Sequence, residues 1–177
     1  MQAALVLMSR APIAGKTKIR LESHLKAEEC AELHKAFLKD RIYNAAADAY
    51  QKSNLPVIIT WSDLPLLDID IFTEALAGLK ERDIVIGPSD DGGYYLLGMK
   101  KPESSLFNFG DKINCSVLDK TIKEASRHNL KCHFLPEASA VDTFKELLEL
   151  RAEIINKNID SNYPQHTKDM LDQIFNY

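Results

Sequence analysis

Two patterns of apolar and polar positions alternate along this chain, and together they predict an α/β fold. Short apolar runs, typical of buried strands, cover Ala3–Met8, Pro56–Thr60, Asp83–Gly87, Tyr94–Met99 and Lys131–Leu135. Between them, three- and four-residue apolar spacing predicts helices over Glu28–Gln51, Thr143–Lys157 and Pro164–Phe175, and a helix after the loop Trp61–Asp68 that contains Phe72, Ala75, Leu76 and Leu79. A further helix runs to about His128, with Ser116 or Asn114 as its cap. This order is typical of a three-layer sandwich with a mainly parallel, Rossmann-like sheet between helices. Ligands of such folds bind beyond the carboxyl ends of the strands.

Length and composition fit one compact domain spanning residues 1–177. The chain has 177 residues, of which 45% are hydrophobic, and a formal net charge of -4. That charge argues against a nucleic-acid-binding surface, because such surfaces need a concentrated excess of Lys and Arg. The apolar start is too short for a membrane span and lacks a basic leader, so we expect a cytoplasmic protein with no membrane partner. The three cysteines are far apart and are expected to be reduced thiols.

The run from Gly87 to Tyr95, Gly-Pro-Ser-Asp-Asp-Gly-Gly-Tyr-Tyr, joins two predicted strands. The glycines Gly92 and Gly93 allow positive φ and close approach to a ligand. The carboxylates of Asp90 and Asp91 can accept hydrogen bonds from hydroxyls or help hold a cation. The run therefore suits a sugar or phosphorylated ligand, although a tight turn that uses Asp and Gly for their geometry has the same local sequence.

A basic loop follows the first predicted strand. Four cations lie within eleven residues of an otherwise acidic protein, and a diphosphate is their natural counterpart. The expected phosphate-binding residues are Arg10, Gly15, Lys16, Lys18 and Arg20. The loop lacks the spaced first glycine of a Walker motif, and a solvated basic loop is the alternative interpretation.

Two further carboxylates stand at strand or helix boundaries. Asp63 follows the second predicted strand, where a single carboxylate can bind a hydrated divalent cation such as Mg²⁺. Asp142 precedes a predicted helix and allows the same interpretation. For either carboxylate taken alone, a helix cap or turn residue is the favoured interpretation. The five histidines are scattered, and no nucleophile elbow is present, which disfavours zinc and serine-hydrolase chemistry.

Four segments carry a family resemblance. They are Leu5–Pro12 with Gly15-Lys16 and Arg20-Leu21, Ser62-Asp63 with Pro65, Gly87-Pro88 through Gly98, and Val141–Thr143 with Leu147. In these segments the chain resembles the glycosyltransferase-A-like family of arsenosugar-biosynthesis-type glycosyltransferases, within the nucleotide-diphospho-sugar transferase superfamily.

The resemblance implies a nucleotide-binding domain with a divalent cation, Mg²⁺ or Mn²⁺, near Asp63 and Asp142. The first loop would then embrace the nucleotide phosphates. Asp90 and Asp91 would act in catalysis, and Gly92, Gly93 and Tyr94 would border the sugar or acceptor. The implied partners are a nucleotide-sugar and a small-molecule acceptor.

The chain departs from this family in ways that leave its activity open. A strand region that usually follows the first long helix is missing, and Leu64 and Leu66 replace a cysteine and a polar residue. Glycosyl transfer is the leading hypothesis. A nucleotidyltransferase that joins a nucleoside triphosphate to a phosphorylated small molecule would use the same residues, and a truncated, non-catalytic binding relative is the third hypothesis. The shortened sheet should expose a strand edge, so we also expect a homo-oligomer.

Overall fold

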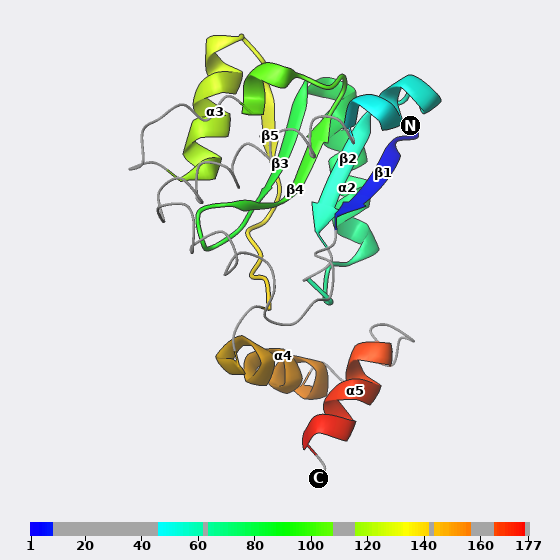
Figure 1. Ribbon diagram of the computed structural model, residues 1–177, viewed down its shortest axis with the longest axis vertical. Coiled ribbons are helices and arrows are strands. Elements are labelled where there is room, and N and C mark those ends of the chain that lie inside the picture. The colour runs from blue at the N-terminus through cyan, green and yellow to red at the C-terminus, as the bar shows by residue number, and fades with distance from the viewer. Residues whose placement is uncertain (9–45, 62–63, 108–115, 142–143, 157–164, 176–177) are drawn as a thin grey trace, which may run out of the picture.

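The computed structural model of the chain describes residues 1–8, 46–61, 64–107, 116–141, 144–156 and 165–175. It contains strands β1 (Ala4–Met8), β2 (Val57–Trp61), β3 (Ile84–Pro88), β4 (Tyr94–Met99) and β5 (Cys132–Phe134). The helices are α2 (Ile69–Glu81), α3 (Val117–Arg127), α4 (Phe144–Asn156) and α5 (Gln165–Phe175), with a 3₁₀ turn η1 (Ser104–Phe107). Residues 46–53 are also helical. Figure 1 shows these elements around one sheet, with α4 and α5 at one end of the molecule.

The described sheet has the order β1-β2-β4-β3-β5, and four of its five strands run in the same direction. The exception is β4, which is antiparallel to both of its neighbours. It is antiparallel to β3 because a short hairpin, rather than a helical crossover, joins the two strands. The predicted α/β fold with a mainly parallel sheet is confirmed.

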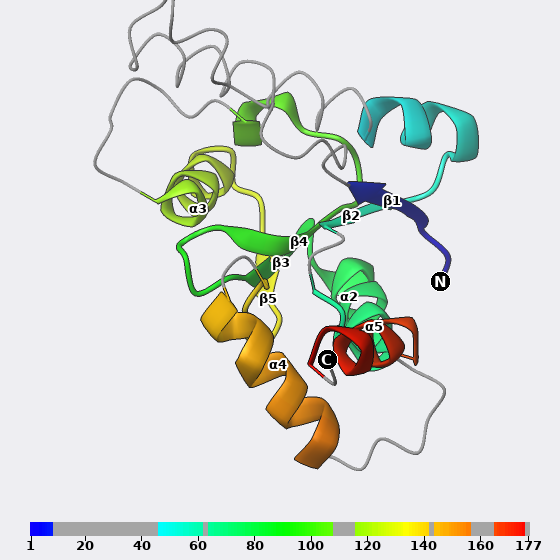
Figure 2. The ribbon, with the colours of Figure 1, turned by 60° about the horizontal axis from the view of Figure 1, so that its bottom comes forward.

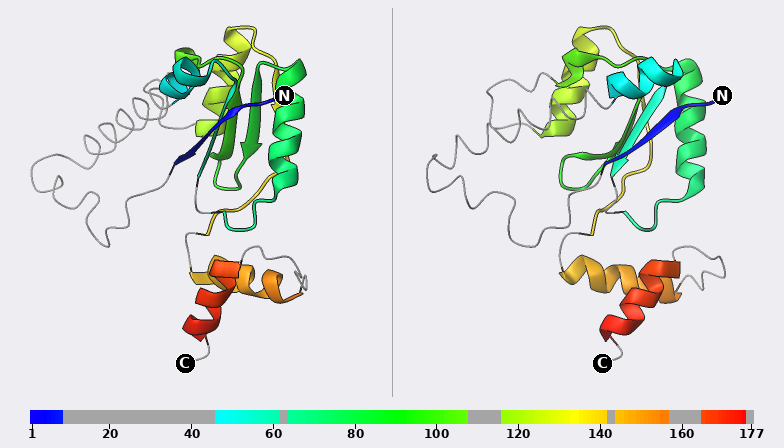
Figure 3. Two further views of the ribbon diagram at one scale, coloured as in Figure 1. Left: turned by 90° about the vertical axis from the view of Figure 1, so that its right-hand side faces the viewer. Right: turned by 45° about the vertical axis from the view of Figure 1, so that its right-hand side comes forward.

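Helices cover both faces of the sheet, as Figure 3 shows from the side. On one face Val57 and Ile59 of β2 pack in a cluster with Ala46 and with Ala125 of α3. On the other face Ile58 packs with residues of α2. Every residue of β4 is buried, which explains its unbroken apolar sequence. The core therefore lies around β2, β4 and β3.

The last two helices form a smaller apolar cluster of their own. Leu150 and Ile154 of α4 pack with Leu171 of α5, and Leu66 and Val141 from the sheet side join this cluster. Figure 2 shows α4 lying across the end of the molecule near the chain that follows β5. This placement brings one side of α4 to the edge of the sheet at which β2 and β5 end.

Local sequence explains where α3 begins. Ser116 has extended backbone angles, and its side-chain oxygen accepts a hydrogen bond from the backbone N–H of Asp119 at 3.0 Å. This contact satisfies one of the free N–H groups of the first turn. The predicted cap at Ser116 is confirmed, and it places the amino end of α3 against the β3–β4 hairpin.

Candidate functional site

Strands β1 and β2 end side by side at the carboxyl edge of the sheet. Met8 and Trp61, their last residues, are register partners in a parallel pair. Neighbouring strands lie about 4.8 Å apart. The segment that follows β1 contains the predicted phosphate-binding residues, and the segment that follows β2 contains Asp63. The two segments therefore start at adjacent points of one edge.

Several predicted site residues lie outside the described part of the chain. They are Arg10, Gly15, Lys16, Lys18, Arg20, Asp63 and Asp142. Their phosphate-binding and metal-binding roles stay predictions. The hairpin residues Asp90, Asp91, Gly92, Gly93 and Tyr94 are described, and the structure shows how each is held.

The β3–β4 hairpin is a tight loop at the same carboxyl edge. The N–H of Ser89 donates to the carbonyl of Gly93 at 3.1 Å, and the N–H of Gly92 donates to the carbonyl of Ser89 at 3.1 Å. Gly92 has φ +83°, a conformation that favours glycine. Asp91 stabilises the loop through its side chain: its Oδ1 accepts hydrogen bonds from the Ser89 hydroxyl at 2.5 Å and from the Gly93 N–H at 2.9 Å. The loop is thus shaped before any ligand arrives.

The two adjacent aspartates have different environments. The hydrogen bonds from Ser89 and from the Gly93 N–H lower the pKa of Asp91, so this carboxylate is a weak base. Asp90 is exposed, and its Oδ2 accepts the Ser139 hydroxyl at 2.6 Å. Both aspartates are exposed, but Asp90 binds a residue of the segment after β5, whereas the Oδ1 of Asp91 accepts its two hydrogen bonds from its own loop.

Tyr94, which the resemblance assigns to the sugar or acceptor, lies in the core. Its side chain is 9% exposed, and its ring meets Trp61 edge to face with centroids 5.6 Å apart. Burial raises the pKa of Tyr94 to about 12, so its hydroxyl is protonated at neutral pH. Its ring stabilises the base of the hairpin.

The next tyrosine, Tyr95, connects the hairpin to the chain that follows β5. Its hydroxyl donates to the carbonyl of Pro136 at 2.9 Å. Its ring fills the space beside Gly87, where an added Cβ would lie 2.5 Å from the ring carbon Cζ. Ala138 reinforces this connection, since its N–H donates to the carbonyl of Pro88 at 3.2 Å. The segment after β5 is therefore held against β3 and β4.

The opposite side of the hairpin is attached to α3. The N–H of Leu118 donates to the carbonyl of Gly92 at 3.1 Å. A Cβ added at Gly92 would lie 3.0 Å from the Cβ of Ser116, so α3 approaches the loop closely. With neighbours on both sides, the hairpin presents Asp90 in a fixed position.

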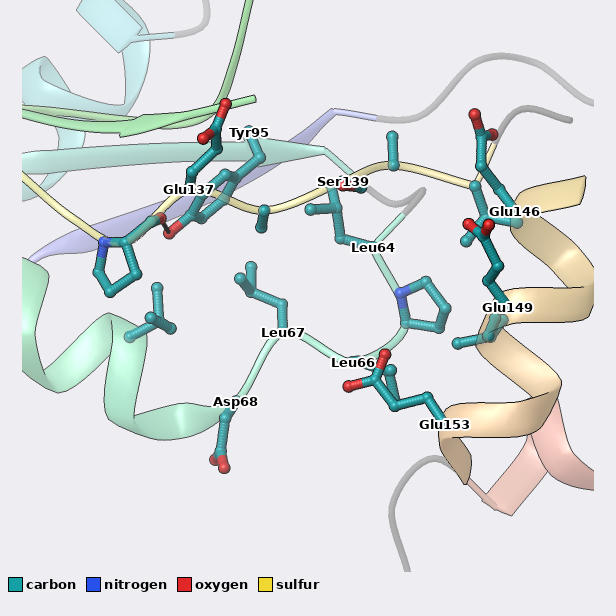
Figure 4. A pocket seen from close by; sticks show the side chains of 17 residues that line it. Leu64, Leu66, Leu67, Asp68, Tyr95, Glu137, Ser139, Glu146, Glu149 and Glu153 are labelled. Carbon is teal, nitrogen blue, oxygen red and sulfur yellow. Dashed lines mark hydrogen bonds between the residues drawn. The ribbon is translucent and has the colours of Figure 1, made fainter. Parts of the chain in front are cut away.

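A cleft of about 450 Å³ opens beside these residues, between the sheet edge and α4. Figure 4 shows Leu64, Leu66 and Leu67 of the segment after β2, and Glu146, Glu149 and Glu153 of α4, around the cleft. Tyr95 and Ser139 also line the cleft, and the bond from Ser139 to Asp90 joins the cleft to the hairpin. Sequence reasoning missed this cleft. The available signal was the pair Leu64 and Leu66, two departures from the resembled family that both form its wall.

The cleft is negatively charged. Its carboxylates are Asp68, Glu137, Glu146, Glu149 and Glu153, and no Lys, Arg or His is among the described residues that line it. Like charges disfavour a diphosphate there. Apolar side chains together with carboxylates suit a neutral, hydroxyl-bearing group instead.

A divalent cation was expected at Asp63 and Asp142. Across the described ranges, no group of three or more His, Cys, Asp and Glu side chains is arranged to hold a metal ion. The chemistry of the predicted donors nevertheless suits Mg²⁺ or Mn²⁺, because both ions favour carboxylate oxygens. In the same part of the chain, no helix has both the length and the apolar character that a bilayer crossing requires.

Comparison with known proteins supports the fold and a family. The sequence profile of the family described as "Uncharacterized protein conserved in bacteria (DUF2064)" matches residues 3–111. The structure resembles the crystal structure of a "putative nucleotide-diphospho-sugar transferase" from Desulfovibrio desulfuricans G20, with a TM-score of 0.70 and 21% identity. That match covers 97% of this chain and 94% of the other. No curated protein matches the sequence.

Proposed function

The chain belongs to the DUF2064 family, and from this premise we propose that it transfers a glycosyl group from a nucleotide-diphospho-sugar to a small acceptor. One observation carries the proposal: the ends of β1 and β2 are adjacent, and the exposed Asp90 lies on the same edge of the sheet. The strands that lead into the basic segment and into Asp63 therefore end next to each other, at the sheet edge that also carries Asp90. The likeness to the Desulfovibrio protein is consistent with this function.

The donor is assigned to the basic segment. Arg10, Lys16, Lys18 and Arg20 supply positive charge for the diphosphate, and the amides around Gly15 donate to its oxygens. Charge on the departing diphosphate grows as the bond from the anomeric carbon to the phosphate oxygen breaks, so these cations stabilise the transition state more than the substrate. A Mg²⁺ or Mn²⁺ ion held by Asp63 and Asp142 would add positive charge at the same place.

The acceptor is assigned to the side of the hairpin that faces the cleft. As the acceptor oxygen bonds to the anomeric carbon, its proton must move to a base, and Asp90 is the better placed of the two aspartates. Asp91 is a positioning residue in this proposal, because its Oδ1 binds Ser89 and Gly93 and these bonds lower its pKa. A well-placed base contributes about 10²- to 10⁴-fold to the rate.

Calorimetry provides the first test. The purified chain is titrated with uridine, guanosine and thymidine diphosphates and their sugars, with and without Mg²⁺ or Mn²⁺. We expect saturable, metal-dependent binding of one base. Asp63→Ala should remove the metal dependence, while Asp48→Asn, which changes an exposed carboxylate before β2, should leave binding unchanged.

The remaining outcomes separate the alternatives. Asp90→Asn should keep donor binding and lose transfer to the acceptor. Release of pyrophosphate from a nucleoside triphosphate in the presence of a sugar phosphate would instead indicate nucleotidyl transfer. No binding across the whole panel would refute the proposal and favour a non-catalytic relative.

A further inference from the structure

Strand β1 has an unpaired edge in the described sheet. It stands at the end of the strand order and pairs there with β2 alone. The N–H of Ala4 donates to the carbonyl of Pro56 at 2.7 Å, so Ala4 directs its backbone groups toward β2. Successive residues of a strand direct these groups to opposite sides. Leu5 and Leu7 therefore present their N–H and C=O groups to the open edge.

The side chains along this edge are apolar and exposed. Leu5 is 59% exposed and Leu7 is 62% exposed. Both lie on the face of the sheet that α2 covers over the central strands. Residues 3–8 contain no charged residue and no proline. Soluble proteins usually protect an edge strand with such residues, with a bulge or with a covering segment. β1 has neither a charge nor a proline to keep another strand away.

We propose that β1 pairs with β1 of a second copy of this chain, antiparallel about a two-fold axis at Val6. This register places Leu5 opposite Leu7 of the second copy, and Leu7 opposite its Leu5. Residues that face each other in a hydrogen-bonded antiparallel pair exchange two bonds. The pairing therefore forms four backbone hydrogen bonds, and it brings four leucine side chains together on one face.

Two features favour a second copy over another occupant. An open strand edge selects a partner that is itself a strand with free backbone groups, and every copy of the chain carries one in β1. The five apolar residues of β1 are also self-complementary, because the two-fold axis pairs the exposed positions only with each other. Although the chain has a net charge of -4, residues 3–8 contribute no charge that would repel the partner strand.

Sedimentation velocity over a range of protein concentrations tests this interface. We expect a concentration-dependent dimer for the wild type, and a dissociation constant at least about 100-fold higher for Leu5→Lys/Leu7→Lys. Both leucines are exposed, so the variant should fold, and circular dichroism checks that it does. The matched control is Ile69→Lys/Ile155→Lys, which adds the same charge at side chains that are 70% and 62% exposed, and its dimer should be unchanged.

Hydrogen exchange at the amides of Leu5 and Leu7 supplies a second measurement. These amides should be protected at high concentration and exchange quickly after dilution. A wild type that is monomeric at every concentration would overturn the proposal, as would a leucine variant that still dimerises. Protection that persists in a monomer would also overturn it, because another part of the same chain would then cover the edge.

Discussion

Replacing Gly87 by alanine tests the packing that holds the hairpin to the chain after β5. The added Cβ would lie 2.5, 2.7 and 2.8 Å from three ring carbons of Tyr95. Gly87 does not have positive φ, so alanine suits its backbone and the strain comes from the contact alone. Tyr95 is 3% exposed, and a shift of its ring away from the added Cβ disturbs its hydrogen bond to Pro136.

The expected decrease in the free energy of unfolding has two parts, overpacking around the new Cβ and a weakened hydrogen bond of Tyr95. Overpacking a core costs about 1–3 kcal/mol, and losing the hydrogen bond from Tyr95 to Pro136 costs about 1 kcal/mol. We therefore expect Gly87→Ala to lower the free energy of unfolding by about 2–4 kcal/mol. Urea unfolding followed through the fluorescence of Trp61, the single tryptophan, measures it. With an m-value of about 2 kcal/mol/M, the midpoint should fall by about 1–2 M.

A double-mutant cycle isolates the contact. In a Tyr95→Val background the ring is gone, so Gly87→Ala should be neutral or stabilising by up to about 1 kcal/mol, because alanine restricts the unfolded chain. As a control, Gly98→Ala places a Cβ 3.2 Å from Cδ1 of Leu79 and 3.3 Å from Cβ of Val85, and it should cost less than about 1 kcal/mol. The reasoning would be refuted if Gly87→Ala lowered the free energy of unfolding by less than about 0.5 kcal/mol, or lowered it by the same amount in the Tyr95→Val background.

Three further predictions concern the hairpin. Because hydrogen bonds lower the pKa of Asp91, its carboxylate stabilises the fold above its ordinary pKa, and this contribution is lost as the pH falls through the lowered value. Wild type and Asp91→Asn should thus differ in free energy of unfolding at about pH 7 and converge toward about pH 3 in urea titrations; a constant difference would contradict this. Gly92→Ala should cost about 1–2 kcal/mol, given its φ of +83° and the closeness of Ser116, and an unchanged melting temperature would count against it. Ser139→Ala should change stability by less than about 0.5 kcal/mol but alter transfer turnover, since it removes the hydroxyl bound to Asp90.

Local sequence predicted the elements well, because apolar spacing and caps act over a few residues. The strands appear where the apolar runs are, and Ser116 caps α3 as expected. The loop expected over Trp61–Asp68 ends where α2 begins, at Ile69, and the expected apolar positions Phe72, Ala75, Leu76 and Leu79 lie within that helix.

What the sequence could not predict depends on contacts between distant segments. The position of β4 between β2 and β3 is set by pairing across the sheet. The cleft combines Leu64 with Glu137 and Glu149, which are far apart along the chain. At Asp91, the same residues fit a ligand site and a self-contained turn, and only the Ser89 and Gly93 bonds show that its carboxylate is already engaged.

The reversed direction of β4 has a consequence for how relatives of this protein can diversify. Residues 89–93 connect two central strands whose register is fixed, so this loop can change its side chains but hardly its length. The segment after β2 leads into a helix rather than back into the sheet, whereas the segment after β5 is tied to the hairpin by the bonds of Pro136, Ala138 and Ser139. Differences in length among relatives should therefore fall in the segment after β2, while the hairpin keeps a constant size.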